Sequence, residues 1–228
     1  MIVGIKFSLN QSLFIRDPQD TELGKKIIQS SIDLIHEIGF EKFTFKKLGQ
    51  KISSTEASIY RYFTNKHMLL LFLNNWYWEW VHYLIKMNTL NVESPSRRMR
   101  LIIENIVYAA TENAATSYVN ENKLHKIIIN EGAKSYHTAS VDDENKQGLF
   151  SSFKMLVESI SQTIMAIDPK FPYPHSLASN LFEMANNQSY FSEHLPRLTD
   201  LKSLDSLDSD LVAMMEFFVS HLLKGYET

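Results

Sequence analysis

Apolar residues recur with helical spacing along nearly the whole chain. In the first such segment they share one helical face: Leu23, Ile27, Leu34, Ile35 and Ile38. They predict a helix over 22–38, which Gly39 ends because glycine adopts a left-handed cap at little cost. We find no convincing run of alternating β-branched residues bounded by turns, so the pattern predicts an all-α fold.

Two short helices are predicted between two longer ones. Thr44 is placed to cap a helix over about 45–52, and Thr55 to cap one of about seven residues, 56–62. A long helix then runs from Lys66 to about Lys86. Two short helices joined by a short turn and held against a long one form a helix-turn-helix arrangement.

Five more helices are expected beyond this segment, which makes about nine in total. Their predicted ranges are 95–113, 117–134, 144–167, 175–191 and 209–224. The domain organisation that follows is an N-terminal arm (1–20), a three-helix helix-turn-helix domain (21–66) and a larger helical domain (67–228) joined to it through the long fourth helix.

Charge is unevenly distributed between these parts. The net charge of the chain is −3, but residues 21–70 hold eight Lys and Arg against five Asp and Glu, whereas residues 71–228 hold thirteen against nineteen. A small basic segment on a larger acidic body suits contact with a polyanion at one end only.

Several classes of protein are not expected. The chain has no cysteine, so disulfides and thiolate zinc sites are excluded, and a reducing cytoplasm fits. The N-terminal segment lacks the basic cluster and cleavage site of a signal peptide, and the longest apolar run near the long helix, Met68–Leu73, is far too short to span a membrane.

No metal, cofactor or enzyme activity is expected either. The eight histidines show no tight ligand spacing. Glu121 and His125 share a helix face, but one such pair arises readily by chance, and a satisfied or exposed histidine is the simpler interpretation. A di-iron bundle would need repeated Glu-x-x-His motifs on facing helices, and we find none.

Three features of the segment stand out together: Gly39-Phe40 after the first helix, Thr44 and Leu48 in the second, and the stretch ASIYRYFTNKHMLL at 57–70. With these features, residues of about 22–70 resemble the DNA-binding domain of TetR-family transcriptional regulators. The resemblance implies that 56–62 is a recognition helix, which can lie in the major groove of DNA. The larger domain matches that family in architecture alone.

The resemblance and the physics of DNA together suggest two sets of contact residues. Those expected to reach phosphates are Thr44, Ser58, Tyr62 and Lys66. Those placed for base edges or a thymine methyl group are Lys46, Glu56, Ala57 and Tyr60. Simpler roles stay open for three of them: a helix cap for Thr44, a core aromatic for Tyr60 and a solvated cation for Lys66.

The segment also departs from the family pattern at three positions. Glu56 stands where many relatives carry a basic or neutral residue, so it would repel phosphate and can help only by accepting from a cytosine amino group. Ser53 replaces the glycine usual in the turn, and Gly49 replaces the usual alanine. Glycine within a helix costs about 0.5–1 kcal/mol, so we expect Gly49→Ala to raise the melting temperature unless close packing requires the glycine.

Two functions are expected of the larger domain. Candidate ligand-binding residues are Trp76, Trp80, His82, Tyr83, Asn105 and Tyr108, although such a cluster is also typical of a core or an interface. Apolar stripes on the last two helices fit either a monomer core or a four-helix interface between two subunits, and the resemblance implies a homodimer.

The function that follows is a sequence-specific DNA-binding transcriptional regulator. We expect a repressor that leaves a palindromic operator when an unidentified small molecule binds. The alternative is a helical protein-interaction module that keeps the helix-turn-helix fold without binding DNA.

Overall fold

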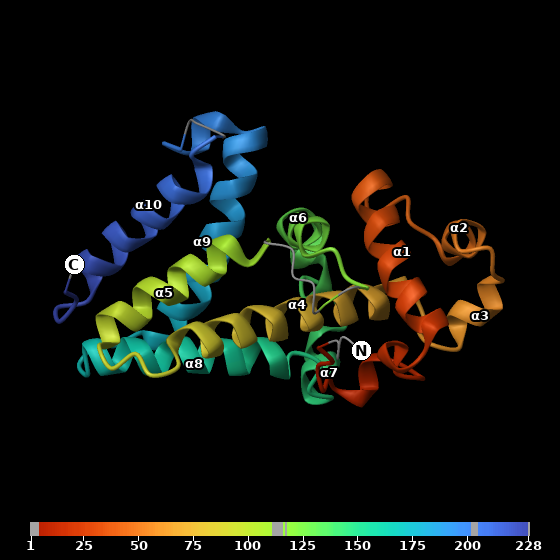
Figure 1. Ribbon diagram of the computed structural model, residues 1–228, viewed down its shortest axis with the longest axis horizontal. Coiled ribbons are helices and arrows are strands. Elements are labelled where there is room, and N and C mark those ends of the chain that lie inside the picture. The colour runs from red at the N-terminus through yellow and green to blue at the C-terminus, as the bar shows by residue number, and fades with distance from the viewer. Residues whose placement is uncertain (1–4, 111–115, 117, 202–204, 228) are drawn as a thin grey trace. The chain divides into compact units, whose positions relative to one another are not determined.

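The computed structural model describes residues 5–110, 116, 118–201 and 205–227. These residues form ten α-helices and no strand, so the all-α prediction is confirmed (Figure 1). The helices are α1 (Glu22–Ile38), α2 (Phe45–Lys51), α3 (Glu56–Tyr60), α4 (Lys66–Thr89), α5 (Pro95–Val107), α6 (Glu121–Glu131), α7 (Val141–Lys146), α8 (Ser151–Ile167), α9 (Pro174–His194) and α10 (Leu207–Leu222).

The chain divides into two compact units. The N-terminal unit comprises Met1–Glu79 and Ala110–Ser152, and the C-terminal unit comprises Trp80–Ala109 and Phe153–Thr228. Helix α4 therefore begins in the first unit and ends in the second. The predicted domain boundary at 66/67 lies inside the N-terminal unit and stays a prediction.

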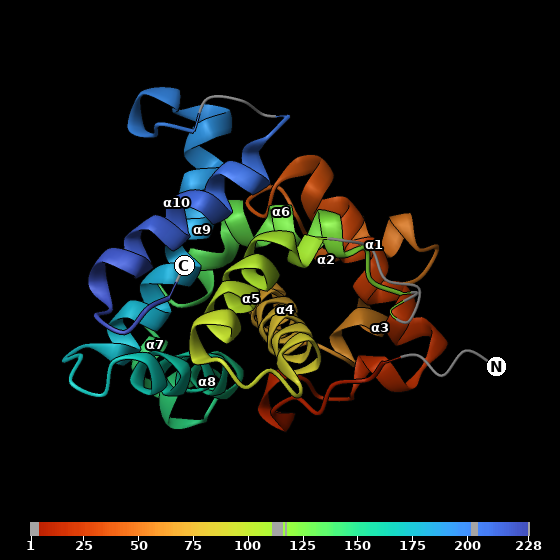
Figure 2. The same cartoon turned by 60° about the vertical axis from the view of Figure 1, so that its left-hand side comes forward.

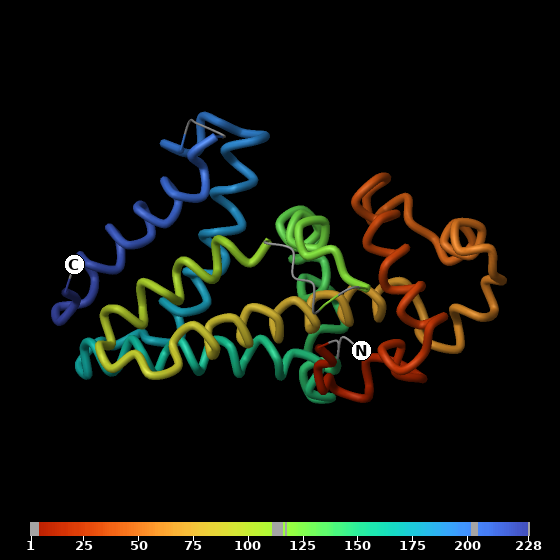
Figure 3. Tube along the Cα trace, in the orientation of Figure 1, coloured from red at the N-terminus to blue at the C-terminus, as the bar shows by residue number. Residues whose placement is uncertain are grey.

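In the N-terminal unit, α1, α2 and α3 enclose a small apolar core. Its fully buried side chains include Ile27, Ile32, Phe43, Leu48, Ile59 and Phe63. Each of the three helices begins with a threonine whose side chain accepts a backbone N–H: Thr21 from Gly24, Thr44 from Lys47 and Thr55 from Ser58. These caps are the ones expected from the sequence for α2 and α3, and they fix where the short helices start. The turn between them is visible in the Cα trace (Figure 3).

The C-terminal unit is built on α5, α9 and α10, which pack on one another (Figure 2). Part of each predicted apolar stripe is buried here, namely Leu177, Leu181, Ala185, Leu211 and Met215. Arg100 of α5 donates to Glu216 of α10 at 2.6 Å. Other apolar residues of α10 stay exposed, with Phe217 at 58%, Phe218 at 41% and Leu222 at 49%.

Three of the predicted helices differ clearly in their boundaries from the helices of the structure. The predicted helix 144–167 is two helices, α7 and α8, because the chain between them passes through Gly148 at φ 76°. The predicted helix 95–113 ends as α-helix at Val107 and continues as a 3₁₀ turn over Tyr108–Ala110, and the one over 117–134 is α6 followed by a 3₁₀ turn over Gly132–Ser135. Residues 111–115 and 117 of these predictions lie outside the described residues.

Candidate nucleic-acid interface

The α2–turn–α3 segment is held together by its own polar side chains. The turn passes through Ser53, which has a left-handed φ of 56°. The amide of Ser54 donates to the carbonyl of Gly49 at 2.8 Å. Ser58 Oγ donates to the carbonyl of Thr55 at 2.6 Å and lies 2.7 Å from Ser54 Oγ. With Ile59 fully buried, α3 is fixed along one side and leaves the other side in solvent.

The four residues predicted to contact bases are all exposed. Glu56, Ala57 and Tyr60 come from α3, and Lys46 comes from the first turn of α2. Tyr60 is 46% exposed, and its ring packs edge-on against Phe45 at 5.1 Å. The simpler interpretation of Tyr60 as a core aromatic therefore does not apply. The Tyr60 hydroxyl lies 3.4 Å from a carboxylate oxygen of Glu56.

The residues predicted to contact phosphates differ in exposure and in the partners that they already have. Thr44 is exposed and Ser58 is half-buried. Lys66 is half-buried, and its Nζ donates to the carbonyls of Phe40 at 3.0 Å and Glu41 at 3.3 Å while lying 4.6 Å above the Phe40 ring. Lys66 is therefore neither solvated nor unpartnered in this structure.

Tyr62 differs most from its predicted role. Its side chain is only 2% exposed, and its hydroxyl lies 2.7 Å from Thr21 Oγ1. Here Tyr62 is a core residue that joins the end of the recognition segment to the start of α1. The predicted phosphate contact of Tyr62 would therefore have to be made by a hydroxyl that already has a protein partner.

The exposed cations absent from the sequence-based list include Arg61 and Arg16. Arg61 follows α3 directly, and Arg16 lies in the N-terminal arm with its guanidinium 5.8 Å from the centre of the Tyr62 ring. The sequence could have indicated Arg61 as a DNA contact, because it adjoins the recognition helix. It could not have indicated Arg16, which lies 45 positions earlier in the chain and comes near Tyr62 only in the folded protein.

The six candidate ligand-binding residues are divided between the two units. Trp76 belongs to the N-terminal unit, is fully buried, and donates from Nε1 to the Tyr118 hydroxyl at 3.4 Å. The other five belong to the C-terminal unit: Trp80, His82, Tyr83, Asn105 and Tyr108.

Within the C-terminal unit, three of these side chains have partners. Trp80 donates to the carbonyl of Ala109 at 3.0 Å and stacks on Tyr83 at 5.9 Å. Asn105 accepts from Asn88 at 2.6 Å. None of the six lines either of two hollows of the described surface, one of about 510 Å³ beside α8 and α9 and one of about 570 Å³ beside the N-terminal arm. Their role in ligand binding stays a prediction.

Within the described residues, Glu121 and His125 belong to no group of three or more potential metal ligands. Glu121 accepts from Thr116. His125 Nδ1 lies 2.5 Å from the Tyr77 hydroxyl. Burial, with a smaller effect from Lys126, lowers the pKa of His125 to about 4, so its ring is neutral near pH 7. Among the described helices, none is both long and apolar enough to span a membrane.

Comparisons with known proteins agree with the motif. Residues 27–72 match the family model described as bacterial regulatory proteins, tetR family. A search of curated proteins found no match.

Three solved structures have similar folds. AibR, in complex with isovaleryl coenzyme A and operator DNA, is 16% identical over 88% of this chain and 97% of its own, with a TM-score of 0.58. A transcriptional regulator from Rhodococcus sp. Rha1 is 11% identical over 93% and 99%, with a TM-score of 0.59. The fatty acid degradation regulator FadR from Bacillus halodurans is 13% identical over 83% and 92%, with a TM-score of 0.56.

Identities this low show a shared fold rather than a shared ligand or operator. The family match, in contrast, covers the helix-turn-helix segment itself, from within α1 to within α4. Residues 27–72 are therefore similar to the tetR family of bacterial regulatory proteins, as the motif indicated, and the chain shares the all-α fold of the three solved structures.

Proposed function

We propose that this protein is a sequence-specific DNA-binding transcriptional regulator that inserts α3 into the major groove. The observation that carries the proposal is the form of α3, which is five residues long, capped by Thr55 and buried only at Ile59. A helix this short contributes little core, but its exposed residues can reach base edges.

Roles within this interface follow from exposure. Lys46, Glu56, Ala57 and Tyr60 contact base edges or the thymine methyl group. Thr44 and Ser58 contact phosphates from the starts of α2 and α3, where free backbone N–H groups also attract anions. Lys66 contacts a phosphate only if its ammonium group leaves the two backbone carbonyls that it binds in this structure. The flexible lysine side chain allows that movement.

We also propose that two subunits associate through the last two helices. Phe217, Phe218 and Leu222 of α10 remain exposed after the C-terminal unit has formed its own core. An exposed apolar helix face of this kind favours a self-complementary two-fold contact. Two copies of α3 held about 34–36 Å apart would read a palindromic site.

Regulation by a small molecule completes the proposal. Binding of an effector in the larger domain favours a conformation in which α4 moves and the two α3 helices no longer fit adjacent turns of the groove, so that repression ends. The effector acts only through its different affinities for the two conformations. AibR, which shares this fold, has been solved with both isovaleryl coenzyme A and operator DNA.

The test begins by selecting bound fragments from a random DNA pool and measuring affinity for the selected duplex. Lys46→Ala should weaken binding, whereas Lys86→Ala, which removes the same charge from the far end of α4, should not. The logarithm of the binding constant should fall steeply with the logarithm of salt concentration. Adding metabolites to the complex then identifies a compound that releases the DNA.

The same measurements detect the alternative function. If no duplex is selected and weak binding is insensitive to salt, the helix-turn-helix segment serves as a protein-interaction module instead. Glu56 at the exposed start of α3 and the internal hydrogen bonds of Tyr62 and Lys66 are the features that agree with that alternative.

A further inference from the structure

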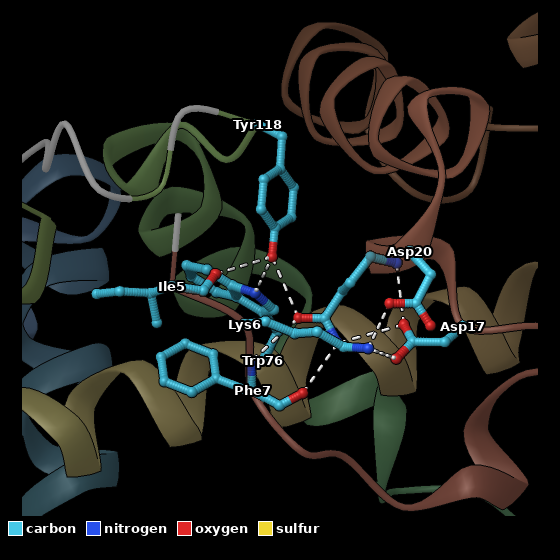
Figure 4. A network of polar contacts seen from close by, with 8 residues as sticks. Ile5, Lys6, Phe7, Asp17, Asp20, Trp76 and Tyr118 are labelled. Atoms are coloured by element: carbon cyan, nitrogen blue, oxygen red, sulfur yellow. Dashed lines mark hydrogen bonds and ion pairs between the residues drawn. The ribbon is translucent and has the colours of Figure 1, made fainter. Parts of the chain in front are cut away.

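The N-terminal arm, residues 5–20, is fastened to the N-terminal unit by a buried polar network (Figure 4). Gln19 is 4% exposed, donates to the carbonyl of Phe7 at 2.9 Å and accepts from the Phe7 amide at 3.2 Å. The Tyr118 hydroxyl lies 3.1 Å from Gln19 Oε1 and 3.4 Å from the carbonyl of Ile5. The Phe7 ring packs edge-on against Trp76 at 5.3 Å. The arm therefore has a fixed path.

The acidic side chains of the arm are neutralised within the arm itself. Lys6 Nζ lies 3.1 Å from Asp17 and 2.5 Å from Asp20. Figure 4 shows the three side chains together. Hydrogen bonds to Asp20 and then Asp17 raise the pKa of Lys6, so the ammonium stays charged. One cation thus compensates two carboxylates that would otherwise repel a nearby polyanion.

The next part of the arm is joined to the end of the recognition segment. The Ile15 amide donates to the carbonyl of Tyr62 at 2.8 Å. The Tyr62 hydroxyl lies 2.7 Å from Thr21 Oγ1, at the start of α1. Arg16, between these two points, is exposed and holds its guanidinium 5.8 Å from the centre of the Tyr62 ring.

Arg16 makes no ion pair within the described residues, although Asp17 and Asp20 are close to it in sequence. Both carboxylates are directed to Lys6 instead. A guanidinium that stays charged, presents paired N–H donors and rests on an aromatic ring is suited to bind a phosphate through two hydrogen bonds.

We infer that Arg16 contacts a phosphodiester of the DNA backbone that flanks the bases read by α3, and that the arm is part of the DNA-binding surface. This inference rests on the proposed DNA-binding function. Because Ile15 is bonded to Tyr62, two residues beyond the end of α3, the phosphate is fixed in register with the recognition helix. The contact contributes affinity and position but no choice of base.

Arg16→Gln tests the inference, with Arg197→Gln, an exposed arginine of the C-terminal unit, as the matched control. Affinity for the selected duplex is measured between low and moderate salt. Arg16→Gln should weaken binding severalfold at low salt and lower the salt slope by about one, with the preferred sequence unchanged, because one phosphate contact is lost. Arg16→Lys should restore part of the affinity and the salt slope.

A second variant tests whether DNA binding depends on the position of the arm, and it leaves the charge of the protein unchanged. Gln19→Leu removes the bonds to Phe7 and Tyr118, so it should weaken DNA binding while Arg16 is still present. If Lys46→Ala weakens binding but Arg16→Gln behaves like Arg197→Gln, the role of Arg16 is wrong and the proposed function stands. If Lys46→Ala is also without effect, the proposed function itself has failed.

Discussion

Ser53 shows how one residue can be strained by the turn that positions α3. Its φ of 56° is a left-handed conformation that costs an L-residue roughly 1–2 kcal/mol, and its side chain is exposed. Ser53→Gly should therefore raise the free energy of unfolding by up to about 1 kcal/mol, because the relieved strain exceeds the added chain entropy of glycine. Ser53→Val should lower it, and thermal unfolding of both variants measures the difference. Equal melting temperatures would show that the turn relaxes without cost.

At Gly49 the structure favours the alternative that the sequence left open, namely that close packing requires the glycine. Helix propensity alone predicts that Gly49→Ala is stabilising, but an added Cβ would lie 3.0 Å from the Ser54 carbonyl oxygen and 3.3 Å from the Glu56 amide. These are backbone atoms of the turn and of α3, so they can yield only if α3 shifts. We expect Gly49→Ala to give no gain in melting temperature and to weaken DNA binding, whereas Gln50→Ala, at the exposed neighbouring position, should change neither.

His125 makes the stability of the N-terminal unit depend on pH. Its pKa falls from an unfolded value of 6.5 to about 4, so at pH values between these the unfolded chain binds the proton and the folded chain does not. Its contribution is complete above pH 6.5 and is lost as the pH falls toward 4. Each pKa unit corresponds to about 1.4 kcal/mol, so the loss amounts to roughly 3 kcal/mol. Denaturant unfolding at pH 7.5 and pH 5 should show about 2 kcal/mol of this loss, because pH 5 still lies above the folded pKa.

A matched pair of variants separates His125 from the other histidines. His125→Gln should remove most of this pH dependence, although it also lowers stability at pH 7.5 by disturbing the contact with Tyr77. His36→Gln changes an exposed histidine of the same unit and serves as the control. If both variants retain the same dependence, His125 is not its source.

At the scale of elements, the seating of the arm on α1 depends on the absence of a side chain at Gly24. A Cβ there would lie 2.2 Å from the carbonyl oxygen of Pro18, which no real structure tolerates. Gly24→Ala must therefore displace the 3₁₀ turn over Pro18–Asp20 from α1. We expect a loss of about 1–3 kcal/mol in unfolding free energy and faster proteolysis within residues 5–20. Ser30→Ala, later in α1, serves as the control and should cause neither.

The elements differ in how well the sequence predicts them, for a physical reason. Caps and periodicity are local, so the helix over 22–38 and the starts of α2 and α3 at Thr44 and Thr55 are predicted correctly. The break at Gly148 is local too, but a single glycine within a long apolar pattern does not signal it clearly. Contacts between distant segments leave no local signal, which is why the burial of Tyr62 against Thr21 and the placement of Arg16 emerge only from the folded chain.

The whole molecule, as proposed, functions only as a pair. Phe218, on the exposed face of α10, should lie within the subunit contact, because its ring is 41% exposed and is flanked by exposed Phe217 and Leu222. Phe218→Asp would bury an unpaired carboxylate in that contact, so it should convert a dimer into a monomer with unchanged helix content. Sedimentation equilibrium and circular dichroism provide the two measurements.

The effect of Phe218→Asp on DNA binding shows whether the exposed face of α10 is the subunit interface. A monomer still presents one α3, so Phe218→Asp should bind an isolated half-site as the unmodified protein does, yet lose most of its preference for two half-sites one helical turn apart. Leu90→Asp, at a 59% exposed apolar residue of the α4–α5 connection, should leave both the dimer and the preference intact. A Phe218→Asp protein that remains dimeric would place the subunit contact elsewhere, and an unmodified protein that is monomeric on DNA would remove the need for a palindrome.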